Sequence, residues 1–132
     1  MRELLQGEHF ILMIDDERRM VRRTRTGRPF ASVSAAEAAW EEMLQAIDTI
    51  ERAKHTLFID LRATQPRDDA AYESLVERNL PRLFAGFRRS AILVKTHAGR
   101  LQILRMHKDT PRVQAFVDET AALAYLTSNE RS

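Results

Sequence analysis

The stretch Thr56-Leu-Phe-Ile-Asp-Leu-Arg62 decides the fold that we expect for this chain. Leu57, Phe58 and Ile59 are apolar at successive positions, and side chains along a strand alternate between its two faces, so both faces of this segment are apolar. Such a strand is typical of the centre of a largely parallel sheet with helices on both sides. The polar segment 62–69 begins at the carboxyl end of the strand, where the sites of open α/β sheets lie. We therefore expect a central strand with a candidate site directly after it.

Two strands and a helix are predicted before the central strand. Residues 9–14 and 19–25 form a hairpin around a polar turn. The second of these strands is weakly apolar, so we expect it near a sheet edge or with one face in water. Ser34 and Glu37 form a capping box that begins a helix, and its apolar stripe continues to Ile50.

A helix, a strand, a short helix, a strand and a closing helix are predicted after the central strand. Asp68 or Asp69 caps the first of these helices. Pro81 should kink that helix or end it, because proline lacks an amide proton and clashes with the preceding turn. Strands are predicted at residues 90–95 and 113–117. Asp118 is predicted to cap the closing helix.

These elements predict one α/β domain over residues 1–132. It has an N-terminal β-hairpin, a mostly parallel central sheet of about five strands, and about four helices. The chain is 44% hydrophobic and 30% charged, and it has no apolar run of the roughly 20 residues that cross a membrane. It lacks cysteine, and residues 1–10 have no apolar secretory core. We therefore expect a cytoplasmic protein.

Positive charge is concentrated on the second predicted strand, although the net charge of the chain is only +2. The resulting basic patch consists of Arg18, Arg19, Arg22, Arg23 and Arg25. The plainest interpretation is a solvated face of the hairpin, where arginines discourage aggregation through strand edges. A protein or other acidic partner and a nucleic acid are the alternatives. Nucleic acid is the least favoured, because the stretch lacks the interleaved aromatic residues of single-strand binders.

Three aromatic residues of the predicted helices are candidates for lining a ligand cavity: Trp40, Phe84 and Phe87. Trp40 lies on the apolar stripe of the first helix, and its large apolar area also favours an ordinary place in the core. The sequence leaves both interpretations open.

Three stretches of the chain follow a known pattern: TLFIDLRA at 56–63, SAILVKTHAGRLQIL at 90–104 and VQAFVDETAALAYL at 113–126. In these stretches the chain resembles the STAS fold of anti-sigma-factor antagonists, and within it the SpoIIAA-like group of small bacterial proteins. Together with the hairpin and the first helix they cover most of the chain. They are hydrophobic frameworks, so the resemblance implies a fold more than an activity.

The resemblance also implies a phosphorylation switch from which this sequence departs. In the antagonists, a serine or threonine that begins the helix after the central strand is phosphorylated by a partner kinase. The matching segment here, Gln65-Pro-Arg-Asp-Asp-Ala-Ala-Tyr72, has acids and alanines instead, so we expect the switch to be lost. Asp68 and Asp69 either cap the helix or imitate a phosphorylated surface. Thr64 and Ser74 remain as alternative phosphate acceptors.

The sequence indicates neither a metal site nor an enzyme, and we expect no cofactor. The histidines lack the local spacing of metal ligands: His9, His55, His97 and His107. There is no cysteine or Gly-x-Ser-x-Gly nucleophile. Asp60 and Arg62 form either a carboxylate with an orienting cation or, more plainly, a salt bridge. No base, pocket and positioned partner are recognisable together.

We expect a non-catalytic domain that binds another protein in a regulatory or scaffolding role. The predicted contact surface lies at the carboxyl ends of adjacent strands and consists of Arg62, Thr64, Arg67, Asp68, Asp69, His97 and Arg100. The turn at 96–100 either binds an anion at the start of a helix, or its histidine and glycine only allow the chain to turn from strand to helix.

The alternative function is a carrier of a small apolar or lipid-like ligand, which the resemblance also implies. A pocket lined by the three aromatic candidates would favour the carrier. A filled core with an exposed apolar patch near the predicted site would favour a protein partner. A homodimer through the hairpin or an exposed helix face is compatible with either function.

Overall fold

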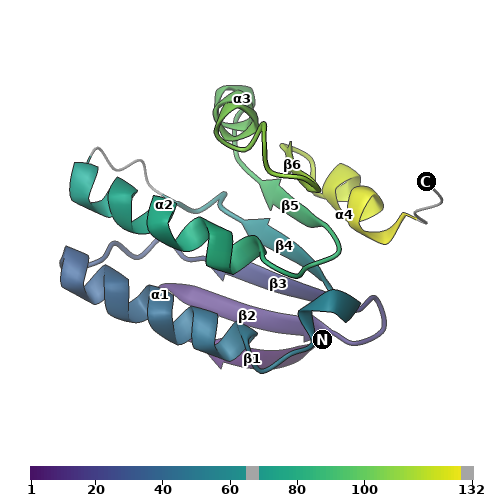
Figure 1. The fold of residues 1–132 in the computed structure, drawn as a ribbon, viewed down its shortest axis with the longest axis horizontal. Coiled ribbons are helices and arrows are strands. Elements are labelled where there is room, and N and C mark those ends of the chain that lie inside the picture. Colours follow the sequence, from purple (N-terminus) through teal and green to yellow (C-terminus); the bar gives the residue numbers. More distant parts are fainter. Residues whose placement is uncertain (65–68, 129–132) are drawn as a thin grey trace.

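The protein is described here by a computed structural model that covers residues 1–64 and 69–128. Within these residues one six-stranded sheet has its strands in sequence order (Figure 1): β1 (Arg2–Gln6), β2 (Phe10–Asp15), β3 (Met20–Arg25), β4 (Thr56–Asp60), β5 (Ser90–Leu93) and β6 (Val113–Phe116). The described helices are α1 (Val33–Ile47), α2 (Ala70–Phe84), α3 (His97–Met106), α4 (Glu119–Thr127) and the 3₁₀ turn η1 (Arg52–Lys54). None of them is long and apolar enough to cross a membrane. The α/β fold class is confirmed.

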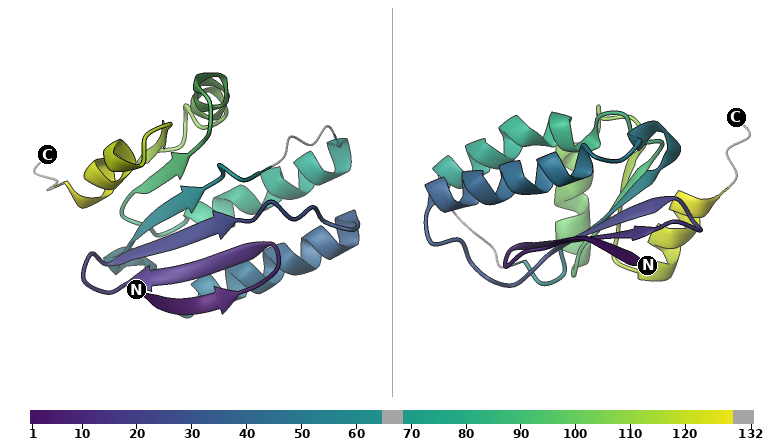
Figure 2. Two further views of the ribbon diagram at one scale, coloured as in Figure 1. Left: turned by 180° about the vertical axis from the view of Figure 1, so that it is seen from behind. Right: turned by 90° about the horizontal axis from the view of Figure 1, so that it is seen from below.

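The strand directions explain where the helices lie. β1, β2 and β3 pair antiparallel, whereas β3, β4, β5 and β6 pair parallel. Two neighbouring parallel strands must be joined by a crossover connection, which usually contains a helix. Crossovers are right-handed, so helices that connect strands added one after another toward the same edge lie on the same face of the sheet. α1 and α2 therefore lie together on one face, and α4, which follows the last strand, covers the opposite face (Figure 2).

The central strand is buried on both faces, as the sequence predicts. Leu57 and Ile59 pack in the larger core beneath α1 and α2, and Phe58 packs in a smaller core beneath α4. All five residues of β4 are buried. The apolar run of this strand thus joins the two cores of the domain.

Several predicted boundaries differ from the structure. β1 was not predicted, because an edge strand with mostly exposed side chains has no apolar pattern. α1 is capped by the Ser32 hydroxyl, which accepts from the Ala35 amide, and not by the Ser34 capping box, and it ends at Ile47. α2 continues past Pro81, because the following Leu83 is almost completely buried in the core.

The position of β3 also differs from the prediction. This strand lies between β2 and β4 and not at an edge of the sheet. Its α1–α2 face is buried, whereas on the opposite face Met20 is buried and Arg22 and Thr24 are partly exposed. Arg23 and Arg25 are in fact 3% and 7% exposed, which contradicts the interpretation of the basic patch as a solvated face.

Arg52 ties the end of α2 to the start of β4. Its Nη1 donates to the carbonyl oxygens of Arg82, Leu83 and Ala85 at 2.6, 3.0 and 2.8 Å. The last carbonyl groups of a helix have no partner within the helix, so a buried cation there satisfies them and suits the negative end of the helix dipole. Gly86 follows in a left-handed conformation, with φ of 84°, which ends the helix.

We expect Arg52→Met to lower the free energy of unfolding by about 1–3 kcal/mol, because three carbonyl groups would lose a charged donor. Chemical denaturation measures this change. Lys54→Met is the matched control, since Lys54 lies in the same turn but pairs with Glu51 in solvent and should change stability little. Equal effects of the two substitutions would contradict the capping role.

Candidate functional site

The arginines of β3 divide between the two faces of the sheet. Arg22 lies on the α4 face above the Phe58 ring, at 4.5 Å from its centroid. Arg23 and Arg25 lie on the α1–α2 face, where they contact aromatic rings of the larger core. The other two members of the predicted basic patch, Arg18 and Arg19, are exposed at the hairpin turn. The five residues therefore do not form one surface.

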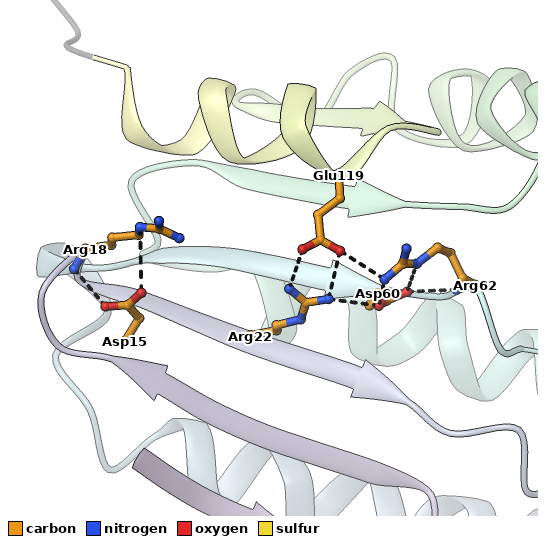
Figure 3. Close-up of polar contacts among 6 residues, drawn as sticks. All are labelled: Asp15, Arg18, Arg22, Asp60, Arg62 and Glu119. Atoms are coloured by element: carbon orange, nitrogen blue, oxygen red, sulfur yellow. Dashed lines mark hydrogen bonds and ion pairs between the residues drawn. The ribbon is translucent and has the colours of Figure 1, made fainter. Parts of the chain in front are cut away.

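On the α4 face, four charged side chains form a closed ion-pair cluster (Figure 3). The Asp60 carboxylate accepts from Arg22 at 3.2 Å and from Arg62 at 2.8 Å. Glu119, the first residue of α4, accepts from the same two guanidinium groups at 3.2 and 3.0 Å. Two anions and two cations thus balance, so the cluster has no unpaired group that could serve as a base.

The electrostatics of this ion-pair cluster follow from its pairing. Burial alone would raise the pKa of Asp60, but hydrogen bonds and charge from Arg62, with charge from Arg22, outweigh it and lower the pKa below its ordinary value. Hydrogen bonding to Arg22 likewise lowers the pKa of Glu119. The salt-bridge interpretation of Asp60 and Arg62 is the one that the structure supports.

The predicted partner surface is scattered. Arg67 and Asp68 lie outside the described residues. Arg62 is held in the ion-pair cluster, and the Asp69 carboxylate accepts from the Ala71 and Tyr72 amides as the cap of α2. The other three members are placed as follows: Thr64 at a cavity on the α1–α2 face, His97 exposed at the start of α3, and Arg100 donating to the Ala115 carbonyl oxygen at 2.9 Å. No hydrogen bond or ion pair joins any two of the described members.

A cavity of about 180 Å³ lies between the sheet and α1, α2 and α3. Most of its wall is aliphatic or aromatic. Two of the three predicted cavity residues, Trp40 and Phe84, line it, whereas Phe87 lines an open groove of about 950 Å³ beside it. The other residues of the cavity wall are Phe10, Arg23, Arg25, Ile59, Leu61, Thr64, Tyr72, Val76, Leu80, Leu83, Ile92, Ile103, Met106 and His107.

The two arginines in the cavity wall have different surroundings. The Arg25 guanidinium donates to the carbonyl oxygens of Thr26 and Arg28 at 2.6 and 2.8 Å, so it fastens the end of β3 to the following loop. Arg23 makes no ion pair, and its Nε and Nη1 are buried without a hydrogen-bond partner among the described residues. Its guanidinium lies instead 4.9 Å from the Phe10 ring centroid and 5.1 Å from that of Trp40.

The burial of Arg23 is costly. Burial lowers the pKa of Arg23 to about 10, which is the direction expected when a cation loses its hydration. Cation–π contacts return about 0.5–2 kcal/mol. The penalty for burying an ion is several kcal/mol even after the protein relaxes. The two rings therefore leave much of the cost uncompensated.

The sequence prediction missed Arg23, Arg25 and Tyr72 as cavity residues. The alternation along β3 could have indicated the two arginines, because Val21 belongs to the larger core and residues two and four positions later share its face. The sequence interpretation assigns these arginines to solvent because it expects the strand near a sheet edge or with one face in water.

The metal ligands and the phosphate acceptors considered from the sequence can also be located among the described residues. Over residues 1–64 and 69–128, no three side chains that could bind a metal ion come together. Thr64 and Ser74, the two alternative phosphate acceptors, are exposed.

We expect Asp60→Asn to lower the free energy of unfolding at pH 7 by about 1–3 kcal/mol, because Arg22, which is partly buried, and Arg62 would lose a buried charged acceptor. The pKa of Asp60 is lower in the folded than in the unfolded state, where it is about 4, so this stabilisation is present above pH 4 and is lost as the pH falls through the folded-state value. Denaturation at several pH values should show the two proteins converging in acid.

The control is Asp16→Asn, since the Arg2–Asp16 pair is about 60% exposed on both sides and is weakened by solvent. An Asp60→Asn difference that stays constant down to acid pH would contradict the role of the Asp60 charge.

Comparison with known proteins concerns the fold. No family model matches the chain, and no curated protein shows significant similarity to it. One solved structure is similar: an uncharacterized protein of the DUF3478 family from Shewanella loihica PV-4, described as having a SpoIIAA-like fold. The match covers 92% of this chain and 98% of that one, with a TM-score of 0.64 and 16% sequence identity. The protein therefore has the SpoIIAA-like fold that its sequence predicts.

Proposed function

We propose that the protein is a non-catalytic binding domain that holds a small apolar molecule in the cavity between the sheet and α1, α2 and α3. The cavity itself carries this proposal. This partly open, mostly apolar space of about 180 Å³ is bordered by side chains of the larger core, and apolar concavities with a few polar groups are the usual form of small-molecule sites. Cavities of about 150 Å³ with aliphatic and aromatic walls hold benzene.

The charges of the domain support a non-catalytic role. The acids nearest to the carboxyl end of β4, Asp60 and Glu119, are both paired with arginine. Within the described residues, neither faces the cavity. A wall that is mostly apolar, with Arg23, Arg25, Tyr72 and His107 as its titratable side chains and no carboxylate among its described residues, suits binding.

An entry route for a ligand is present beside α3. The four residues Leu80, Phe84, Met106 and His107 line both the cavity and the open groove, so they separate the two spaces. No residue of α3 is buried, so this helix is held by fewer apolar contacts than α1 or α2. Segments with few buried apolar contacts open most easily.

We expect toluene, a neutral probe of suitable size, to bind saturably and to raise the thermal unfolding midpoint, because a ligand of the native state stabilises that state. Trp40 is the single tryptophan and lines the cavity, so its indole NMR signal should move during the titration. Val76→Phe should remove the response, since Val76 is part of the cavity wall and the larger ring would fill the space.

Ala71→Phe is the matched control, because Ala71 is exposed on the same helix and lies outside the cavity wall. Circular dichroism checks that both variants fold. Wild-type protein that does not bind toluene, or Val76→Phe protein that binds it as well as wild type, would refute the proposed function.

A second candidate function, binding of a partner protein in a regulatory or scaffolding role, is favoured by the surface of α3. Leu101 and Met106 are 55% and 49% exposed on this helix. Removing such apolar surface from water favours association. The candidate partner surface is therefore α3, which also carries His97 and Arg100 of the contact surface that the sequence predicts.

We expect Leu101→Glu to abolish retention of a specific partner in a pull-down from the native cell, because a charge would replace an apolar contact. Gln102→Glu adds the same charge at a neighbouring exposed position and should leave retention unchanged. Identical partners for wild type and both variants would exclude α3 as the contact surface.

A further inference from the structure

We propose that the ligand of the cavity is a small apolar carboxylate, with its carboxylate on the guanidinium of Arg23 and its apolar body among the rings and aliphatic side chains of the wall. This inference rests on the proposed function. It adds the charge of the ligand and the residue that recognises it.

Buried donors without a hydrogen-bond partner among the described residues occur on three residues of the cavity wall, Arg23, Arg25 and Trp40, and those of Arg23 and Trp40 support an anion. Arg23 is 3% exposed, and its Nε and Nη1 meet no acceptor among the described residues. Trp40 is also 3% exposed, and its Nε1 has no acceptor there either. Buried donors are nearly always paired in native proteins, so donors left unpaired in one wall indicate an acceptor supplied from outside the chain. A carboxylate can accept from both at once.

The described groups around Arg23 do not supply the counter-charge. Besides burial, the described groups that act on the pKa of Arg23 are Tyr72, which raises it, and the cation Arg25, which lowers it; neither is a carboxylate. Asp60 and Glu119 lie on the opposite face of the sheet, where Arg22 and Arg62 neutralise them. An anion that enters the cavity would thus meet a cation without competition from a described carboxylate.

The size and wall of the cavity define the remainder of the ligand. A volume of about 180 Å³ exceeds by a little the space that benzene occupies in apolar cavities. It therefore suits one ring or a short branched chain with a carboxylate, such as benzoate. Most of the other residues of the wall are aliphatic or aromatic, including Ile92, Leu83 and Phe84, and they favour an apolar body over a hydroxylated one.

The experiment compares benzoate with its neutral relatives toluene and benzyl alcohol on wild-type protein. Calorimetry gives the affinities, and the Trp40 indole signal reports binding in the cavity. We expect benzoate to bind about 10- to 100-fold more tightly than toluene, the factor that corresponds to a charge-assisted hydrogen bond. Benzoate affinity no greater than toluene affinity would overturn the inference and leave the proposed function standing. Failure of every probe to bind would overturn both.

Arg23→Met should abolish the preference for benzoate and leave toluene binding unchanged. Methionine matches the length of the stem and can pack against Phe10 and Trp40, so we expect this variant to fold. Arg23→Lys keeps the charge and should retain part of the preference. Arg18→Met removes one charge at the exposed hairpin turn and controls for the net charge of the protein.

A structural role of Arg23 predicts a different outcome. If the guanidinium served only to stack between the two rings, Arg23→Met would destabilise the protein, and benzoate and toluene would bind alike to wild type. That result would overturn the inference. If Arg23→Met does not fold, Arg23→Lys and the probe series on wild type still decide it.

Discussion

The interior position of β3 in the sheet is the constraint on which the polar structure of this protein depends. Side chains of a strand alternate, so a run of arginines in an interior strand places cations on both faces of the sheet. On the α4 face, Arg22 meets Asp60 and Glu119, and the charges balance. On the α1–α2 face, Arg25 donates to carbonyl oxygens, whereas the contacts of the Arg23 guanidinium within residues 1–64 and 69–128 are with two aromatic rings. The same sequence pattern therefore produces one neutral cluster and one uncompensated charge.

The fold could be predicted from the sequence because its signals are local and periodic. The apolar run 57–59 identifies a strand buried on two faces, and the apolar stripe of α1 identifies an amphipathic helix. Residues such as Asp118, whose side chain accepts from the Ala121 amide, mark helix starts within a few positions. β1 escaped prediction because an edge strand buries too little to leave a pattern.

The site could be predicted only in part, because it depends on which strands are neighbours. Trp40 and Phe84 are recognisable as large aromatic residues on apolar stripes, and both line the cavity. Arg23 looks like a surface residue in any one-dimensional reading, since arginine is rarely buried. Its role depends on β4 lying beside β3 and on α1 and α2 lying above them, and this long-range arrangement has no local signal.

Whether the buried cation is a lysine or an arginine decides how the free-energy cost of its burial can be reduced. A buried lysine can lose its proton near neutral pH and become neutral, but arginine holds its proton. Burial lowers the pKa of Arg23 only to about 10, so the side chain stays charged at pH 7. Deprotonation therefore does not relieve the cost of burying Arg23 at pH 7, and the anion that we propose as ligand would relieve it. A ligand that supplies this anion would also stabilise the native state, by about 2.7 kcal/mol at a concentration of one hundred times its Kd. A domain built in this way would couple its stability to occupancy, which is a physical basis for a binding protein whose conformation depends on its ligand.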